Sequence, residues 1–529
     1  MYDLDEARLL LFELPQDAPR KALDDIAFWL DSIRGAAGFR PESRVAIIML
    51  MDETAQPLHA ELLHQYLSAP HLQDFQGLHL WQCIHAFSKA LSGAYTACID
   101  EYQQARNHEL TEQIPLICVR LLRAVAEQMK LELMRYIEVE PSVWQSLCVC
   151  YRLAETEQCT ESMVIAYPGH VIHTSPQREL VRALVLYISS TETLAADQLE
   201  VSYRIAGRLV GFFDFKTAAD ADCPYQFDLS ANAPPQRMKG GQQSTPELRF
   251  FGAARAQPAI SKIIDQNESD PVWQERRFGS EFTPAGKLTV LKHLHTYWAQ
   301  EPPHRHQERR SISVVIEVAH GFRIVGQLVT RIDLGRVVGT GQDEMSEKDR
   351  ARITLAADKD IDYTTEIWTV SDVGADGIGV TLTKNVGACV KIGDLCALKP
   401  QNSQLWWVGM VRRLHTDAEG KVHAGIETLA KNPMSVWLRA LGKGAEKASN
   451  WETSSGSFEY TYLPIILLPD AHNSYLNATM LMESGSYVHG NIYQAMMGEK
   501  SRDLKLTSLI AEGEDYEQVG FEWLVGKET

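Results

Sequence analysis

The fold of the second half of the chain can be predicted from residues 366–382, EIWTVSDVGADGIGVTL. Residues 366–370 and 379–382 carry apolar side chains with a period of two, which indicates β-strands with one buried face. Residues 371–379 form a glycine-rich segment between them, and glycine lets a backbone approach its neighbours without a Cβ clash. The segment therefore predicts two strands joined by a glycine-rich turn.

Similar strand patterns lie on both sides of this segment, at residues 314–318, 405–413 and 422–429. A series of short strands separated by turn residues predicts a small closed β-barrel, because closure removes exposed strand edges. We expect this barrel to occupy residues 300–442. A helix over residues 433–441 is expected to cap it.

The tail of the chain has strand-like pieces of its own, at residues 462–468 and 519–523. Both are rich in β-branched, aromatic and other apolar residues, which favours strands. Residues 456–529 are therefore predicted to form a small C-terminal β-domain.

The first 212 residues show a different period, with apolar side chains recurring every three or four positions. One example places Leu23, Ile26, Ala27 and Leu30 on the same side of a helix. This spacing predicts an N-terminal all-α helical bundle over residues 1–212.

A connector is expected over residues 213–299, where Pro, Gly, Gln and Asp become frequent. It is predicted to contain a short strand at residues 249–251 and a helix at residues 284–298. The predicted fold class is thus multi-domain α+β: the helical bundle, the connector, the barrel and the small C-terminal β-domain.

Composition and charge exclude several classes of protein. The chain has 529 residues and a formal net charge of −18, so as a whole it repels nucleic acid and anionic lipid. The acidic N-terminus lacks the basic region of a signal peptide, and the sequence contains no apolar run long enough to span a membrane. The nine cysteines form no CxxC pair, unlike a disulfide framework or a zinc site. We therefore expect a cytoplasmic protein without membrane insertion, without nucleic acid as a partner and without a metal site.

Three arginines lie in the segment HRHQERR, residues 304–310, directly before the first predicted barrel strand. Arginine pairs bidentately with phosphate, reads the O6 and N7 edge of guanine and stacks on flat rings. Arg305, Arg309 and Arg310 are therefore candidate ligand-binding residues for a nucleotide. This segment is a local basic exception in an acidic chain.

Asp372 lies in the glycine-rich turn and is a candidate acceptor for the N1 and N2 donors of guanine. The backbone N–H groups of such a turn can also face a ligand. The sequence contains no nucleophile elbow, phosphate-binding P-loop or paired metal-binding histidines of an enzyme. No catalytic residue is assigned, and the chain is not expected to be an enzyme or to need a cofactor.

These two motifs together resemble the PilZ family, whose pattern is RxxxR in a lead-in segment followed by (D/N)xSxxG between two barrel strands. Residues 305–309, RHQER, fit the first motif. Residues 372–377, DVGADG, fit the second except at Gly374, where the family has serine. Residues 406–413 and 424–429 are similar to the closing strands of that barrel, and the N-terminal helical half is interpreted as a family-specific extension.

The resemblance implies a receptor for the second messenger cyclic di-GMP. Arg305 and Arg309 would hold phosphates and guanine edges, while Asp372 and Gly377 would shape the loop. Loss of the serine hydroxyl at Gly374 removes one ligand hydrogen bond, worth on the order of 1 kcal/mol.

Two functions remain open from the sequence. In the first, cyclic di-GMP draws the arginine segment onto the barrel and alters domain packing or partner binding, with a protein partner on the helical N-terminal half. The alternative is a ligand-independent protein-interaction scaffold with a degenerate PilZ domain. Intact Arg305 and Arg309 favour the receptor, whereas Gly374 favours the scaffold.

Overall fold

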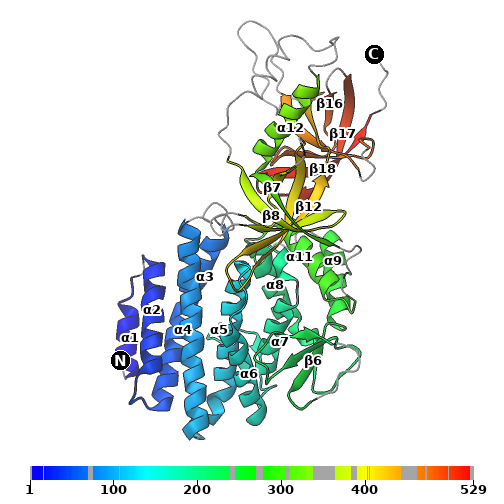
Figure 1. The fold of residues 1–529 in the computed structure, drawn as a ribbon. Helices are drawn as coiled ribbons and strands as arrows, with labels where there is room; N and C mark the ends of the chain where they lie inside the picture. Colours follow the sequence, from blue (N-terminus) through cyan, green and yellow to red (C-terminus); the bar gives the residue numbers. More distant parts are fainter. Residues whose placement is uncertain are drawn as a thin grey trace. The chain divides into compact units, whose positions relative to one another are not determined.

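The computed structural model describes most of the chain. The described residues are 3–15, 17–68, 75–105, 108–238, 245–269, 278–301, 303, 309–337, 364–382, 390–401, 403, 405–441, 462–470, 474–497 and 500–524. They divide into two compact units, Met1–Arg305 and His306–Thr529, which we call the helical unit and the barrel unit. Figure 1 shows the elements of both units in chain order.

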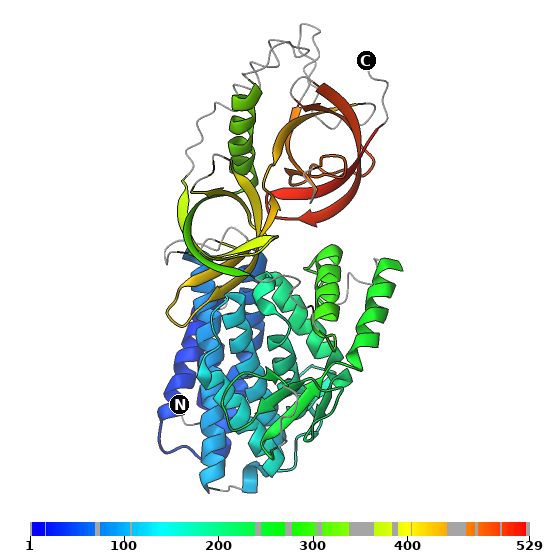
Figure 2. The same cartoon turned by 45° about the vertical axis from the view of Figure 1, so that its right-hand side comes forward.

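The helical unit is built mainly of α-helices, as the three- and four-residue spacing predicted. Its α-helices are α1 Leu4–Phe12, α2 Pro19–Gly35, α3 Pro41–Ser68, α4 Phe75–Ala105, α5 Ile114–Met134, α6 Pro141–Thr156, α7 Pro176–Tyr187, α8 Ala196–Leu209, α9 Ala256–Ser269 and α11 Pro284–Tyr297. The 3-10 turns are η2 His108–Gln113, η3 Thr191–Thr193 and η4 Val210–Phe212. In the views of Figures 1 and 2, α2 to α5 run alongside one another.

Local sequence explains where several of these helices begin. Proline occupies the first position of α2, α3, α6, α7 and α11, where its missing N–H and its fixed φ cost nothing. Ser175 and Thr283 add side-chain caps, because their oxygens accept hydrogen bonds from the backbone N–H groups of Arg178 and Gly286. The predicted face of α2 is buried, with Leu23, Ile26 and Leu30 fully covered.

Residues 213–299 pack onto the helical core. The strands β3 Asp214–Lys216, β4 Tyr225–Asp228, β5 Gln236–Arg237 and β6 Leu248–Gly252 form one antiparallel sheet in the order β3-β6-β4-β5. A small hairpin, β1 Val164–Ile165 with β2 His173–Thr174, precedes α7. Phe251 from the sheet and Leu291 from α11 join the same hydrophobic core as the helices α1 to α8.

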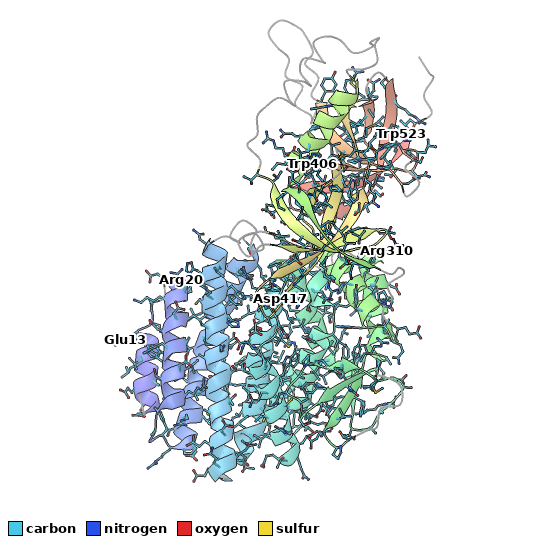
Figure 3. All side chains as sticks on the ribbon, viewed as in Figure 1. Glu13, Arg20, Arg310, Trp406, Asp417 and Trp523 are labelled. Carbon is cyan, nitrogen blue, oxygen red and sulfur yellow. The ribbon has the colours of Figure 1, made fainter. Side chains whose placement is uncertain are left out.

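The barrel unit contains two closed antiparallel barrels within its described residues (Figure 2). The first consists of β7 Arg310–His320, β8 Glu366–Val373, β9 Gly377–Leu382, β10 Leu395–Pro400, β11 Trp407–Thr416 and β12 Val422–Ala430 in the order β10-β11-β12-β9-β8-β7. The second consists of β13 Met434–Ala440, β14 Tyr462–Leu468, β15 Thr479–Glu483, β16 Ile492–Met497, β17 Lys500–Glu512 and β18 Tyr516–Trp523 in the order β13-β14-β15-β18-β17-β16. The side chains of Trp406, just before β11, and Trp523 in β18 are labelled in Figure 3.

The helix predicted over residues 433–441 is wrong. These residues form strand β13, which pairs with β14 and β16 of the second barrel. Val436 and Leu438, two positions apart, point into that barrel and are fully buried. A period of two therefore governs this short segment, and pairing partners far along the chain supply its backbone hydrogen bonds.

One of the described helices contacts both barrels. Helix α12, Phe322–Val337, packs against strands of both, and Phe322 and Val325 share a hydrophobic core with Leu395 and Ile466. The backbone N–H of Phe322 donates to Oδ2 of Asp515 at 2.6 Å, so a carboxylate from the turn before β18 caps the start of α12.

Helices that could cross a membrane are absent from the part of the chain that the structure describes.

Candidate functional site

The turn between β8 and β9 is tied down at both ends. The backbone N–H of Gly374 donates to the carbonyl of Gly377 at 2.8 Å, which closes the turn on itself. The backbone N–H of Thr428 in β12 donates to the carbonyl of Asp376 at 2.9 Å. The turn is thus anchored to β12, the strand that pairs with β9 in the barrel, and its backbone is held in place.

A β-bulge decides which way Asp372 faces. Trp368 and Val370 are buried inside the barrel, and simple alternation would send Asp372 inward as well. The pairing register shifts between Val370 and Asp372, so that Asp372 pairs with Gly379 on the outer face. The extra residue therefore moves the carboxylate from the apolar interior to the surface.

Arg309 and Asp372 form an ion pair at this surface. Nη1 of Arg309 lies 2.7 Å from Oδ1 of Asp372, and the two side chains are 37% and 30% exposed. Arg310, labelled in Figure 3, is exposed at the start of β7 and pairs with Val373. A half-exposed pair of this kind contributes about 0.2–1 kcal/mol. A stronger anionic partner can therefore displace the carboxylate from the guanidinium at low cost.

The three glycines of the hairpin meet different surroundings. A Cβ on Gly374 would lie 3.6 Å from the carbonyl oxygen of Gly377 and 3.7 Å from Cγ of Arg309, which are ordinary contacts. A Cβ on Gly377 would lie 2.5 Å from the carbonyl oxygen of Ile426, and one on Gly379 would lie 2.3 Å from Oδ2 of Asp372. Glycine is therefore required by space at 377, where the close atom belongs to the backbone. At 379 a Cβ would have to displace the side chain of Asp372, and position 374 has room for a side chain.

Sequence reasoning missed two features of this surface. The first is Gly379, over which the carboxylate of Asp372 lies. The second is the ion pair between Nε of Arg412 and Oε2 of Glu427 at 2.6 Å. This pair lies beside the turn, because Glu427 of β12 pairs with Gly377 of β9. The glycines at 377 and 379 could have been noticed as a pair, since residues two apart lie on one face of a strand.

The structure brings together the predicted residues Arg309, Arg310, Asp372, Gly374 and Gly377 at one end of the first barrel. Arg305 lies outside the described residues. The ligand-binding role of all six residues stays a prediction. Groups of three or more histidine, cysteine, aspartate or glutamate side chains that could hold a metal ion are absent from the described ranges.

The closed first barrel, with Arg309 and the turn from Asp372 to Gly377 at one end, fits the PilZ class of proteins, and the comparisons with known proteins agree. The model described as "Cyclic-di-GMP receptor FimW, N-terminal domain" matches residues 5–220, and "Cyclic-di-GMP receptor FimW, middle PilZ domain" matches residues 332–434. The chain belongs to the PilZ family of cyclic di-GMP receptors and carries the helical N-terminal domain of the FimW type. The predicted resemblance and the predicted fold class are confirmed. The PilZ match contains Asp372, Gly374 and Gly377 and begins after the arginine segment.

A solved structure titled "MrkH, A novel c-di-GMP dependence transcription regulatory factor" is similar at 10% sequence identity. The match covers 31% of this chain and 74% of that chain, with a TM-score of 0.13. A likeness of this size carries no argument about fold or function. Among curated proteins, none matches the chain.

Proposed function

We propose that this protein is a cytoplasmic cyclic di-GMP receptor that binds its ligand on the outer face of the first barrel, at the turn between β8 and β9. The observation that carries the proposal is the convergence of Arg309 and Asp372, 2.7 Å apart, above that turn. Arginine supplies a fork for a phosphodiester, and an aspartate supplies acceptors for the Watson–Crick edge of guanine.

We propose that the ligand binds by replacing Asp372 as the ion-pair partner of Arg309. A phosphodiester that approaches Arg309 competes with Asp372 for one guanidinium, and the released carboxylate becomes free to accept from a guanine base. The cost of opening a half-exposed pair is about 0.2–1 kcal/mol. Charge-assisted bonds to phosphate and base are roughly twice as strong as neutral ones and offset that cost.

The location of the arginine motif supports a role in domain packing. The boundary between the two compact units falls between Arg305 and His306, inside the RxxxR motif. A ligand that engages both Arg305 and Arg309 would therefore bind the segment of chain that connects the two units. We propose that ligand binding orders the arginine segment on the first barrel and thereby changes how the helical unit and the barrel unit pack, a disorder-to-order switch.

A protein partner is proposed for the helical unit. Leu9 and Phe12 of α1 and Phe28 of α2 are 67%, 86% and 70% exposed. Leu9 and Phe12 are three positions apart, so they share one face of α1, and an exposed apolar patch commonly marks an interaction site. Nucleic acid is not proposed as a partner, since the net charge of −18 opposes it.

The proposal is tested by calorimetric titration of the full chain with cyclic di-GMP, with GTP and cyclic di-AMP as controls. An Arg305→Ala, Arg309→Ala double variant should lose binding, because both phosphate-binding forks are removed. Arg323→Ala is the matched control, since Arg323 is an exposed arginine on α12. Absence of binding in the wild-type protein would contradict the receptor and favour the scaffold.

A further inference from the structure

A row of paired residues crosses the outer face of the first barrel, starting at the proposed ligand site. Asp372 of β8 pairs with Gly379 of β9. Gly379 pairs with Gly425 of β12, which in turn pairs with Arg413 of β11. Residues directly opposite one another on neighbouring strands point to the same face of a sheet. Arg413 therefore lies on the same face as Asp372, three strands further along one row.

A β-bulge turns Arg413 outward, as another bulge does for Asp372. The pairing register of β11 and β12 shifts between Val411 and Arg413, so Arg412 is the extra residue. Val411 is fully buried, whereas Arg412 and Arg413 are both exposed. Two bulges thus place a carboxylate and a guanidinium at the two ends of the row.

The two positions between Asp372 and Arg413 carry no side chain. A Cβ on Gly379 would lie 2.3 Å from Oδ2 of Asp372, so the carboxylate lies over that strand. A Cβ on Gly425 would lie 3.2 Å from Cβ of Arg413, and apart from the glycine's own chain neighbours no other described atom lies within 4 Å of it. The surface above Gly425 is therefore open between the carboxylate and the arginine.

The length of this row exceeds what one guanine can cover. Neighbouring strands lie about 4.8 Å apart, so three strand spacings separate Asp372 from Arg413 by about 14 Å along the sheet. Only a ligand with a recognition group at each end can contact both residues. Cyclic di-GMP carries two guanines on opposite sides of one cyclic phosphodiester core.

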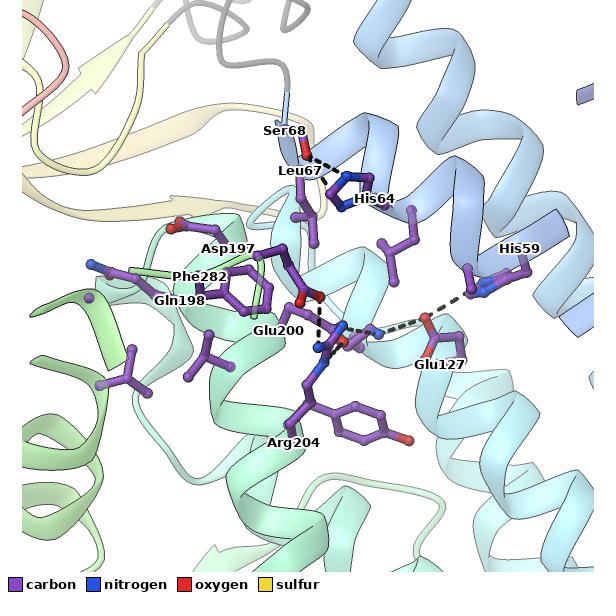
Figure 4. Close-up of a pocket in the computed structure, with 18 of the residues that line it drawn as sticks. His59, His64, Leu67, Ser68, Glu127, Asp197, Gln198, Glu200, Arg204 and Phe282 are labelled. Atoms are coloured by element: carbon purple, nitrogen blue, oxygen red, sulfur yellow. Dashed lines mark hydrogen bonds and ion pairs between the residues drawn. The ribbon is translucent and has the colours of Figure 1, made fainter. Parts of the chain in front are cut away.

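The cavity of the helical unit differs from this surface. It has a volume of about 540 Å³, and its lining includes His59, Glu127 and Glu200 (Figure 4). Nζ of Lys130, which is fully buried, lies 2.7 Å from Oε1 of Glu127 and 2.5 Å from Oε2 of Glu200. Separating a buried ion pair leaves an uncompensated charge, whereas an exposed arginine can turn to a ligand at low cost. The barrel surface is therefore the better place for an anionic dinucleotide.

We propose that Arg413 is a further ligand-binding residue, which donates to O6 and N7 of the second guanine while Asp372 accepts from N1 and N2 of the first. The proposal rests on the cyclic di-GMP site at Arg309 and Asp372. Arginine is the commonest specific partner of the O6 and N7 edge of guanine. Adenine presents an amino donor in place of O6, so an arginine at this position selects guanine. The receptor thereby reads both bases of its ligand.

The test compares cyclic di-GMP with the hybrid cyclic GMP-AMP, which has one adenine on the same cyclic core. Calorimetric titration of the full chain at one salt concentration measures both Kd values. Adenine has no N1–H to donate to a carboxylate, so the guanine of the hybrid goes to Asp372 and its adenine faces Arg413. We expect the wild-type protein to bind the hybrid about tenfold or more weakly than cyclic di-GMP.

Arg413→Ala isolates the second contact. This variant should bind cyclic di-GMP about tenfold more weakly and bind the hybrid with little change, so the preference for two guanines is lost. Arg323→Ala is the matched control, because it removes one exposed arginine from α12 of the same unit and should leave both Kd values unchanged. The melting temperature of each variant without ligand reports whether it folds.

The outcomes separate this inference from the proposed function. If the wild-type protein does not bind cyclic di-GMP, both are wrong. If it binds and folded Arg413→Ala has the wild-type Kd for cyclic di-GMP, the role of Arg413 is overturned while the receptor stands. An equal loss for both ligands also overturns the reading of the second guanine, since it would assign Arg413 to a phosphate that the two ligands share. A loss confined to cyclic di-GMP supports the inference.

Discussion

Replacing Gly374 by serine restores the residue of the PilZ pattern and tests the proposed site directly. The structure has room for it, since a Cβ would make only ordinary contacts at 3.6 Å and 3.7 Å with Gly377 and Arg309. Gly374 is also not among the glycines with positive φ. We therefore expect Gly374→Ser to fold normally, with a change in the free energy of unfolding of no more than about 1 kcal/mol.

The expected gain in affinity follows from one added hydrogen bond. A side-chain hydroxyl that donates to the ligand contributes about 1 kcal/mol net, which corresponds to an approximately fivefold lower Kd. Gly374→Ala adds the Cβ without the hydroxyl, and Ala375→Ser adds the same hydroxyl at the neighbouring exposed position of the turn. Neither of these two variants should tighten binding.

Calorimetric titration with cyclic di-GMP measures all four proteins under one salt condition, because ion-pair contributions depend on ionic strength. A Kd for Gly374→Ser equal to that of Gly374→Ala would refute the reasoning that the missing hydroxyl faces the ligand. A large loss of stability in Gly374→Ser would refute the geometry of the turn.

Three further predictions concern the barrel unit. Gly377→Ala should lower the free energy of unfolding by about 2 kcal/mol or more, since the alanine Cβ would lie 2.5 Å from the carbonyl oxygen of Ile426. Urea unfolding measures this change, and an unchanged midpoint would contradict the prediction. Gly379→Ala should weaken cyclic di-GMP binding with little loss of fold, because its Cβ would displace the carboxylate of Asp372; binding equal to wild type would count against a role for that carboxylate. Burial raises the pKa of Asp394 to about 6. Between about pH 4 and 6 this carboxyl is therefore protonated in the folded protein and ionised in the unfolded chain, so the free energy of unfolding falls as the pH rises through this window. Asp394→Asn should therefore raise stability by about 1–3 kcal/mol at pH 7.5 and change it little at pH 4, and urea unfolding that shows an equal effect at both pH values would contradict this.

Much of the fold followed from local sequence. The spacing of Leu23, Ile26 and Leu30 predicted the buried face of α2, because a helix repeats every 3.6 residues whatever it packs against. The period of two around residues 366–382 predicted β8 and β9, and the glycines between them predicted the turn. These signals reside in neighbouring residues, so the sequence alone carries them.

Register and partnership were decided by tertiary structure. Residues 433–441 are short and apolar enough for either a helix or a strand, and only pairing with β14 and β16 makes them β13. Asp372 reaches the outer face because the register shifts between it and Val370, which depends on how β8 pairs with β9 and β7. A shift of one residue reverses every later side chain in a strand.

The sequence by itself determined that this protein has a helical half, a β-rich half and an arginine motif before a glycine turn. The tertiary structure decided that Arg309 meets Asp372 and that His59, Glu127 and Glu200 line one cavity. Those groups are separated by tens of residues in the chain, and their distances depend on packing between elements, which no local period encodes.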